Sequence, residues 1–157
     1  MHTPPTKLTE ADARRSLHDH LLEKAARARE RYGPRIDADA ILKILSDPDF
    51  IRYPTGIRFD SAGLEPGEFG YPMPLGDHPS RGFCLVLHPS FEHRRQLWPT
   101  LIAYHIPPIN YGEIASPEDC EQFAAALLGV DIDTYYDTLC SLVDSIPGQV
   151  HASGSTS

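Results

Sequence analysis

Residues 82–106 read GFCLVLHPSFEHRRQLWPTLIAYHI, and this stretch decides how the rest of the chain can be arranged. Its two ends, Gly82–His88 and Thr100–Ile106, are rich in apolar, β-branched and aromatic residues, and each has glycine or proline close by. Runs of this composition and length predict β-strands. Two weaker strand candidates precede them, at Gly56–Asp60 and Glu68–Tyr71. Together these segments predict a small sheet in the middle of the chain.

Proline limits the form that this sheet can take. Ten of the 15 prolines lie between residues 48 and 112, and a proline removes a donor from the hydrogen-bond ladder of a sheet. The strands must therefore be short and separated by loops. The connection over residues 90–99 is short for a parallel crossover, which usually needs a dozen or more residues, so an antiparallel hairpin is favoured and a parallel pair is the alternative.

Helical patterns flank the middle on both sides. Over Leu8–Tyr32 the apolar residues recur at spacings of three and four, which predicts an amphipathic helix. Side chains suited to cap helix N-termini precede this helix and three further ones, at Thr9, Asp37, Ser116 and Asp131 or Asp133. The predicted fold is α+β: a small, mainly antiparallel sheet in about residues 50–112, covered by two N-terminal and two C-terminal helices.

The length of 157 residues fits one domain, and the apolar and charged fractions of 41% and 23% are typical of a globular protein. We expect a single globular domain over residues 1–147. The last ten residues, 148–157, are mostly small and polar, and they predict a disordered tail.

The net charge of −8 argues against nucleic acid and against an anionic membrane as the main partner. The charge is unevenly placed, because the first 36 residues are rich in Lys and Arg, whereas neither residue occurs after Arg95. A basic first helix and an acidic last third can pack together within one chain or meet across a dimer. We therefore expect self-association or a protein partner.

The cysteines indicate a reducing compartment. Cys84, Cys120 and Cys140 are odd in number and widely spaced, which matches neither a disulfide framework nor a zinc motif. The N-terminal residues contain no apolar segment of the kind found in a signal peptide, and no apolar run approaches the roughly 20 residues that cross a bilayer. These features predict a soluble, cytoplasmic protein.

A histidine-rich stretch is the strongest chemical signal in the sequence. Imidazole and carboxylate groups are suitable ligands for a divalent transition metal, zinc above all. The spacing matches no established metal motif. The hypothesis of a metal site takes His78, His88 and His93 as ligands, with Asp77 and His105 as alternatives and Glu92 as the base that activates a bound water.

The predicted topology separates two of these histidines. In an antiparallel hairpin, His88 and His105 lie roughly 16 Å apart, which is too far for one ion. In a parallel arrangement both lie at carboxyl ends of strands, where open sheets place their sites. The alternative to a metal site is that the histidines form hydrogen bonds within the loops.

Three functional hypotheses of different class follow. The sequence contains no GxSxG elbow, no P-loop and no other complete catalytic motif, which favours a non-catalytic binding or accessory protein that self-associates. The second hypothesis is a metal-dependent, hydrolase-like enzyme that uses the histidine-rich stretch. The third is a binder of small anions, with Arg81, Arg94 and Arg95 as the anion-binding residues.

Overall fold

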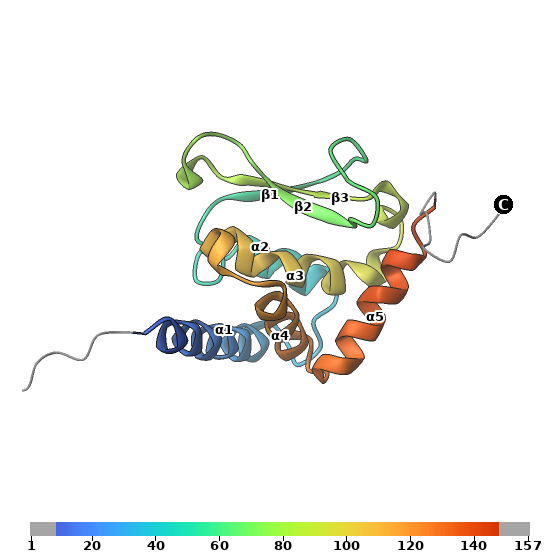
Figure 1. Ribbon diagram of the computed structural model, residues 1–157. Coiled ribbons are helices and arrows are strands. Elements are labelled where there is room, and N and C mark those ends of the chain that lie inside the picture. The colour runs from blue at the N-terminus through green and yellow to red at the C-terminus, as the bar shows by residue number, and fades with distance from the viewer. Residues whose placement is uncertain (1–8, 148–157) are drawn as a thin grey trace, which may run out of the picture.

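The computed structural model describes residues 9–147, so the tail expected at 148–157 lies outside the described residues. The described residues form five helices and three strands (Figure 1). In chain order these are α1 (Glu10–Tyr32), α2 (Ala38–Leu45), β1 (Thr55–Phe59), β2 (Gly70–Pro74), β3 (Phe83–Leu87), α3 (Trp98–Tyr111), α4 (Pro117–Leu128) and α5 (Ile132–Asp144).

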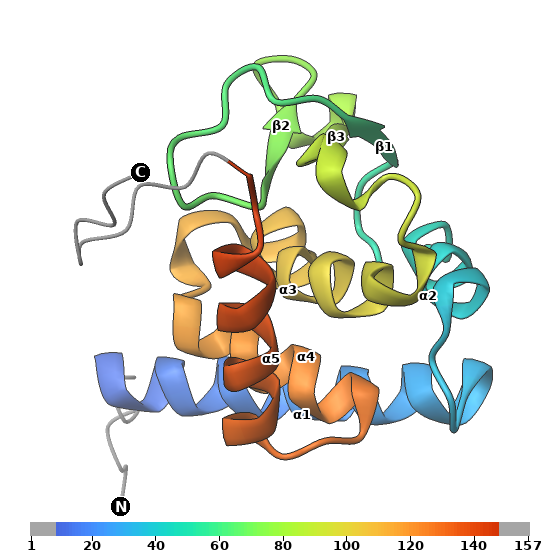
Figure 2. The ribbon, with the colours of Figure 1, turned by 90° about the vertical axis from the view of Figure 1, so that its right-hand side faces the viewer.

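The elements are stacked in layers. The sheet lies over α2 and α3, and α1 and α4 lie on the side of α3 away from the sheet (Figure 1). Helix α5 packs against α4 and α3, as the turned view in Figure 2 also shows. This arrangement confirms the predicted α+β fold. No helix among residues 9–147 is long and apolar enough to span a membrane.

The sheet has the strand order β1-β3-β2, so β3 is its centre. Strand β3 pairs antiparallel with β2 and parallel with β1, which makes the sheet mixed rather than mainly antiparallel. Strands β1 and β3 lie where the sequence predicts them, whereas β2 begins two residues later than expected. Strand β2 contains Pro72 and Pro74 and lies at an edge, where a missing ladder donor is tolerated.

The segment Thr100–Ile106 is helical, which corrects the strand predicted there. It belongs to α3, in which ten of the 14 residues are buried and the other four, Thr100, Tyr104, Pro108 and Tyr111, are partly buried. The partly buried residues lie on one side of the helix, but no residue of α3 is Asp, Glu, Lys or Arg, so the helix has no strongly polar face and its sequence reads like a buried strand. Its length of 14 residues is the feature that favours a helix, because strands rarely exceed ten.

The prolines of α3 explain why its helical character is hidden. Pro99 lies in the first turn, where a backbone donor has no partner within the helix. Pro107 and Pro108 lie inside the helix and cannot donate to the carbonyls of Ala103 and Tyr104. Such residues usually end a helix, and here burial of the helix between the sheet and α4 compensates for the lost hydrogen bonds.

The remaining helices begin at the predicted caps. Thr9 and Ser116 form capping boxes with Asp12 and Asp119. In each box the side chain of the first residue accepts from the backbone N–H of the aspartate, and the aspartate side chain accepts from the backbone N–H of the first residue. The carboxylates of Asp37 and Asp131 accept hydrogen bonds from the backbone N–H groups three residues later, that of Ala40 in α2 and that of Thr134 in α5.

The basic first helix packs against the acidic end of the same chain. Helix α1 contacts α4 along its length, and Arg14 Nη1 lies 3.5 Å from Asp119 Oδ2. The Arg29 side chain lies over Gly129, at the C-terminus of α4, where a cation is favourable. Of the two alternatives drawn from the uneven charge, packing within one chain is therefore observed, and self-association stays a prediction.

Candidate functional site

The histidines of the middle region begin tight turns. His78 and His88 each precede a Pro-Ser pair, and each starts a short 3₁₀ helix, Pro79–Arg81 and Pro89–Phe91. In both turns the histidine Nδ1 accepts a hydrogen bond from the backbone N–H of the serine, at 3.1 Å. An Nδ1 that accepts leaves the proton of a neutral ring on Nε2, so neither nitrogen has a free lone pair for a metal.

The other proposed metal residues lie apart from a common centre. Asp77, Glu92 and His93 have exposed side chains. Across residues 9–147, no three or more His, Cys, Asp and Glu side chains gather into a group that could hold a metal ion. The described residues thus do not bring His78, His88 and His93 together as a ligand set.

His105 is separated from these loops because it belongs to α3. It is 4% exposed, and its ring packs 5.1 Å from that of Phe69. Its Nε2 atom is buried and has no hydrogen-bond partner among the described residues. Burial lowers the pKa of His105 to about 3, so the ring is neutral at physiological pH.

The three arginines proposed to bind anions are placed differently from one another. Arg95 pairs with Asp39 of α2 at 2.8 Å and lies over the ring of Trp98, so its charge is already compensated. The side chain of Arg81 lies against Gly76, and Arg94 is exposed. Of the three, Arg95 is the one that the structure shows to have an acidic partner.

Three basic side chains gather around a tyrosine where α1 approaches the C-terminal end of α3. His20, Lys24, Arg52 and Tyr111 make up this group, which is termed the Lys24 cluster below. His20 Nε2 lies 2.5 Å from the Tyr111 hydroxyl. Lys24 Nζ and the Arg52 guanidinium carbon each lie 5.9 Å from the centre of the Tyr111 ring. The Tyr111 ring therefore lies within cation–π range of Lys24 and Arg52, and its hydroxyl is hydrogen-bonded to His20.

Arg52 is held in position by a buried asparagine. Asn110 is 2% exposed, and its Oδ1 accepts a hydrogen bond from the Arg52 backbone N–H at 2.8 Å. Arg52 Nη1 donates to the backbone carbonyl of Asn110 at 3.1 Å, at the C-terminal end of α3. Asn110 Nδ2 in turn donates to the carbonyl of Phe50 at 2.8 Å. These bonds fix the guanidinium beside Tyr111 and leave its other donors free for further partners.

Lys24 is buried without a counter-ion. It is 7% exposed and forms no hydrogen bond or ion pair with another residue in the described part of the chain. Its Nζ still touches solvent. Burial and the positive charges of Arg27 and Arg52 lower the pKa of Lys24, and the charge of Asp49 opposes this effect.

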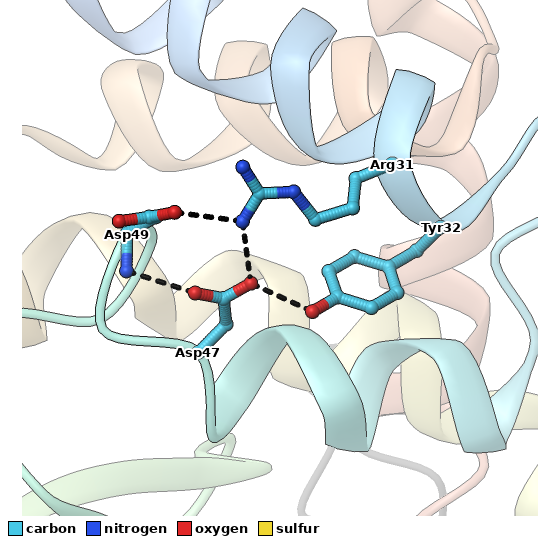
Figure 3. Close-up of polar contacts among 4 residues, drawn as sticks. All are labelled: Arg31, Tyr32, Asp47 and Asp49. Carbon is cyan, nitrogen blue, oxygen red and sulfur yellow. Dashed lines mark hydrogen bonds and ion pairs between the residues drawn. The ribbon is translucent and has the colours of Figure 1, made fainter.

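The nearby carboxylates are bound to another arginine. Arg31 Nη1 lies 2.8 Å from both Asp47 Oδ2 and Asp49 Oδ2, and Figure 3 shows its guanidinium between the two. The Tyr32 hydroxyl donates to Asp47 Oδ2 at 2.6 Å, and this hydrogen bond is the main cause of the lowered pKa of Asp47. Asp47 and Asp49 carry two negative charges against the single positive charge of Arg31, so one negative charge remains and offsets only part of the two positive charges of Lys24 and Arg52.

A cleft of about 320 Å³ adjoins the Lys24 cluster. Arg52 and Tyr111 form part of its wall, and the remaining wall is largely apolar, with Tyr53, Phe83 and Ile114 among its residues. The arrangement combines a cationic end with an apolar body. A cationic end of this kind can accept an anion.

The sequence held a signal for Lys24 that the periodicity alone did not resolve. Lys24 follows Leu21 by three positions and precedes Ala28 by four, so it interrupts the apolar stripe of α1. A lysine at a stripe position is expected to be buried, and a buried charge is rarely found without a partner of opposite charge. Arg52 and Tyr111 had no comparable signal, since His20 and Tyr111 are 91 residues apart and meet only through the fold.

No family model, no curated protein and no solved structure matches the chain.

Proposed function

We propose that this chain is a binding protein for a small anion, which Lys24 and Arg52 hold beside Tyr111. The observation that carries the proposal is the burial of Lys24 without an ion pair, near the two cations Arg27 and Arg52 and with Asp49 as the opposing charge. An uncompensated buried charge costs free energy, and a bound anion supplies the missing negative charge. A site of this kind is unfavourable when empty and is stabilised by its ligand.

The two cations suit an anion in different ways. The planar guanidinium of Arg52 can donate two parallel hydrogen bonds to a carboxylate or phosphate, and Lys24 supplies a compact charge. The hydrogen bonds between Arg52 and Asn110 hold the guanidinium in place before the ligand arrives. Such preorganisation reduces the entropy that binding would otherwise cost.

Thermal unfolding in inorganic phosphate tests the proposal. At about ten times the Kd of phosphate, we expect the Tm to rise by about 3 °C or more relative to sodium chloride of the same ionic strength. Lys24→Met keeps a long apolar side chain and removes the charge, so this variant should lose most of the phosphate response. Lys43→Met removes an exposed lysine of α2 and should keep the response.

The stability of the variants without phosphate serves as the control for folding. Because burial lowers the pKa of Lys24, the folded state disfavours the charged amine, and removal of that charge should stabilise the protein at pH 7. Arg94→Gln tests the alternative anion site that the sequence suggested. A phosphate response that survives in Lys24→Met and disappears in Arg94→Gln would overturn the proposal.

A further inference from the structure

The cleft beside the Lys24 cluster is built for more than a bare anion. It measures about 320 Å³, which lies within the range of small-molecule sites in proteins. An inorganic anion would occupy only the end formed by Arg52 and Tyr111. The rest of the cleft would then keep water against aromatic and aliphatic side chains, which is unfavourable.

The walls of the cleft are suited to a flat ring. The rings of Tyr53 and Phe83 lie 6.0 Å apart and are tilted by 48° to each other, and Pro108 lines the same space. Ile114 belongs to the wall with 64% of its surface exposed, so it is an apolar side chain that solvent reaches. Aromatic and proline surfaces of this kind pack well against planar apolar groups.

We infer that the ligand of this site is an aromatic carboxylate, whose ring occupies the cleft and whose carboxylate pairs with Arg52, which lines the cleft, while Lys24 lies on the Tyr111 side and adds its positive charge. The inference rests on the proposed function, because it assigns the anionic end of the ligand to the Lys24 cluster. Arg52 and Tyr111 connect the cleft to the Lys24 cluster, since both belong to the cluster and both line the cleft. The site thus recognises charge and apolar shape at the same time.

Binding of 2-naphthoate, acetate and 2-naphthylmethanol to the full chain separates the two contributions. Isothermal titration calorimetry should give a Kd for 2-naphthoate at least about tenfold lower than that for acetate, because the ring is buried. It should also be at least about tenfold lower than that for 2-naphthylmethanol, because the alcohol lacks the charge that Arg52 pairs with.

Two variants locate the ring. Ile114→Glu places a carboxylate on the cleft wall at an exposed position, so the fold should be kept while 2-naphthoate binding falls by about tenfold or more. The matched control is Val130→Glu, at another exposed apolar residue that does not line the cleft, and it should leave binding unchanged.

The outcomes distinguish this inference from the proposed function. If phosphate stabilises the protein through Lys24 but 2-naphthoate binds no more tightly than acetate, the proposed function stands and the aromatic ligand is excluded. Equal binding of 2-naphthylmethanol and 2-naphthoate also overturns the inference, because the charge then contributes nothing. If Lys24→Met changes neither the rise in Tm caused by phosphate nor the Kd of any carboxylate, both the proposed function and the inference fail.

Discussion

His105 lies inside α3 with a buried, unpaired Nε2, and this residue makes the stability of the protein depend on pH. Its pKa falls from 6.5 to about 3 on burial, so below pH 6.5 the unfolded chain binds a proton that the folded chain excludes. The stability is therefore full above pH 6.5 and is lost as the pH falls from 6.5 toward 3. Tyr104, next to His105, has its pKa raised to about 12 and stays neutral over this range.

We expect His105 to reduce the free energy of unfolding by about 2 kcal/mol between pH 7.5 and pH 5. In His105→Leu this loss should be absent, because the apolar side chain neither titrates nor leaves a nitrogen unpaired. Urea unfolding at both pH values measures the difference. His93→Gln removes an exposed histidine and should keep the pH dependence of the wild type. A loss of equal size in His105→Leu would show that other groups cause it.

The His-Pro-Ser turns show how residue type can suggest chemistry that local structure explains. The sequence repeats this motif at His78 and His88, and both rings accept hydrogen bonds from the backbone two residues later. By residue type the two rings are candidate metal ligands, and hydrogen bonding within the loops is the alternative. The structure supports that alternative for these two residues.

At the scale of elements, the junction of α1 and α4 depends on one glycine. Gly129 ends α4 with φ +73°, in the left-handed region that favours glycine, and a Cβ at this position would collide with the Arg29 guanidinium. We expect Gly129→Ala to lower the free energy of unfolding by about 1–2 kcal/mol, from backbone strain and displacement of Arg29. Chemical denaturation measures this change.

Gly56 provides the matched comparison in β1. A Cβ built there meets no atom within 4 Å, and its φ is not in the left-handed region. Gly56→Ala should therefore be neutral or raise the free energy of unfolding by up to about 1 kcal/mol. If both substitutions have the same effect, the crowding at Gly129 is not what makes that position sensitive.

At the scale of the whole molecule, the opposite charges of the two ends are already used within one chain. Helix α1 packs on α4, and Arg14 pairs with Asp119. Because this pairing needs no second copy, we expect the mass measured by light scattering at micromolar concentration to be the same in 50 mM and 500 mM salt. A dimer at low salt that dissociates at high salt would show that the charges also act between chains.

The local features of the chain were predicted well because they depend on neighbouring residues. Caps such as Thr9 and Ser116 bond to atoms three residues away, so the sequence marks where their helices begin. The apolar residues of β1 and β3 and the glycine and proline residues that bound these strands are local signals in the same sense. These signals were enough to predict the α+β class and four of the five helices in residues 9–147.

The tertiary structure alone decided the identity of α3 and the place of the candidate site. Helix α3 lies between the sheet and α4 and exposes no charged residue, so it lacks the polar face by which a sequence reveals a helix. The Lys24 cluster joins α1, the segment before β1 and the end of α3. Contacts between residues so far apart along the chain leave no local pattern, because packing alone brings their side chains together.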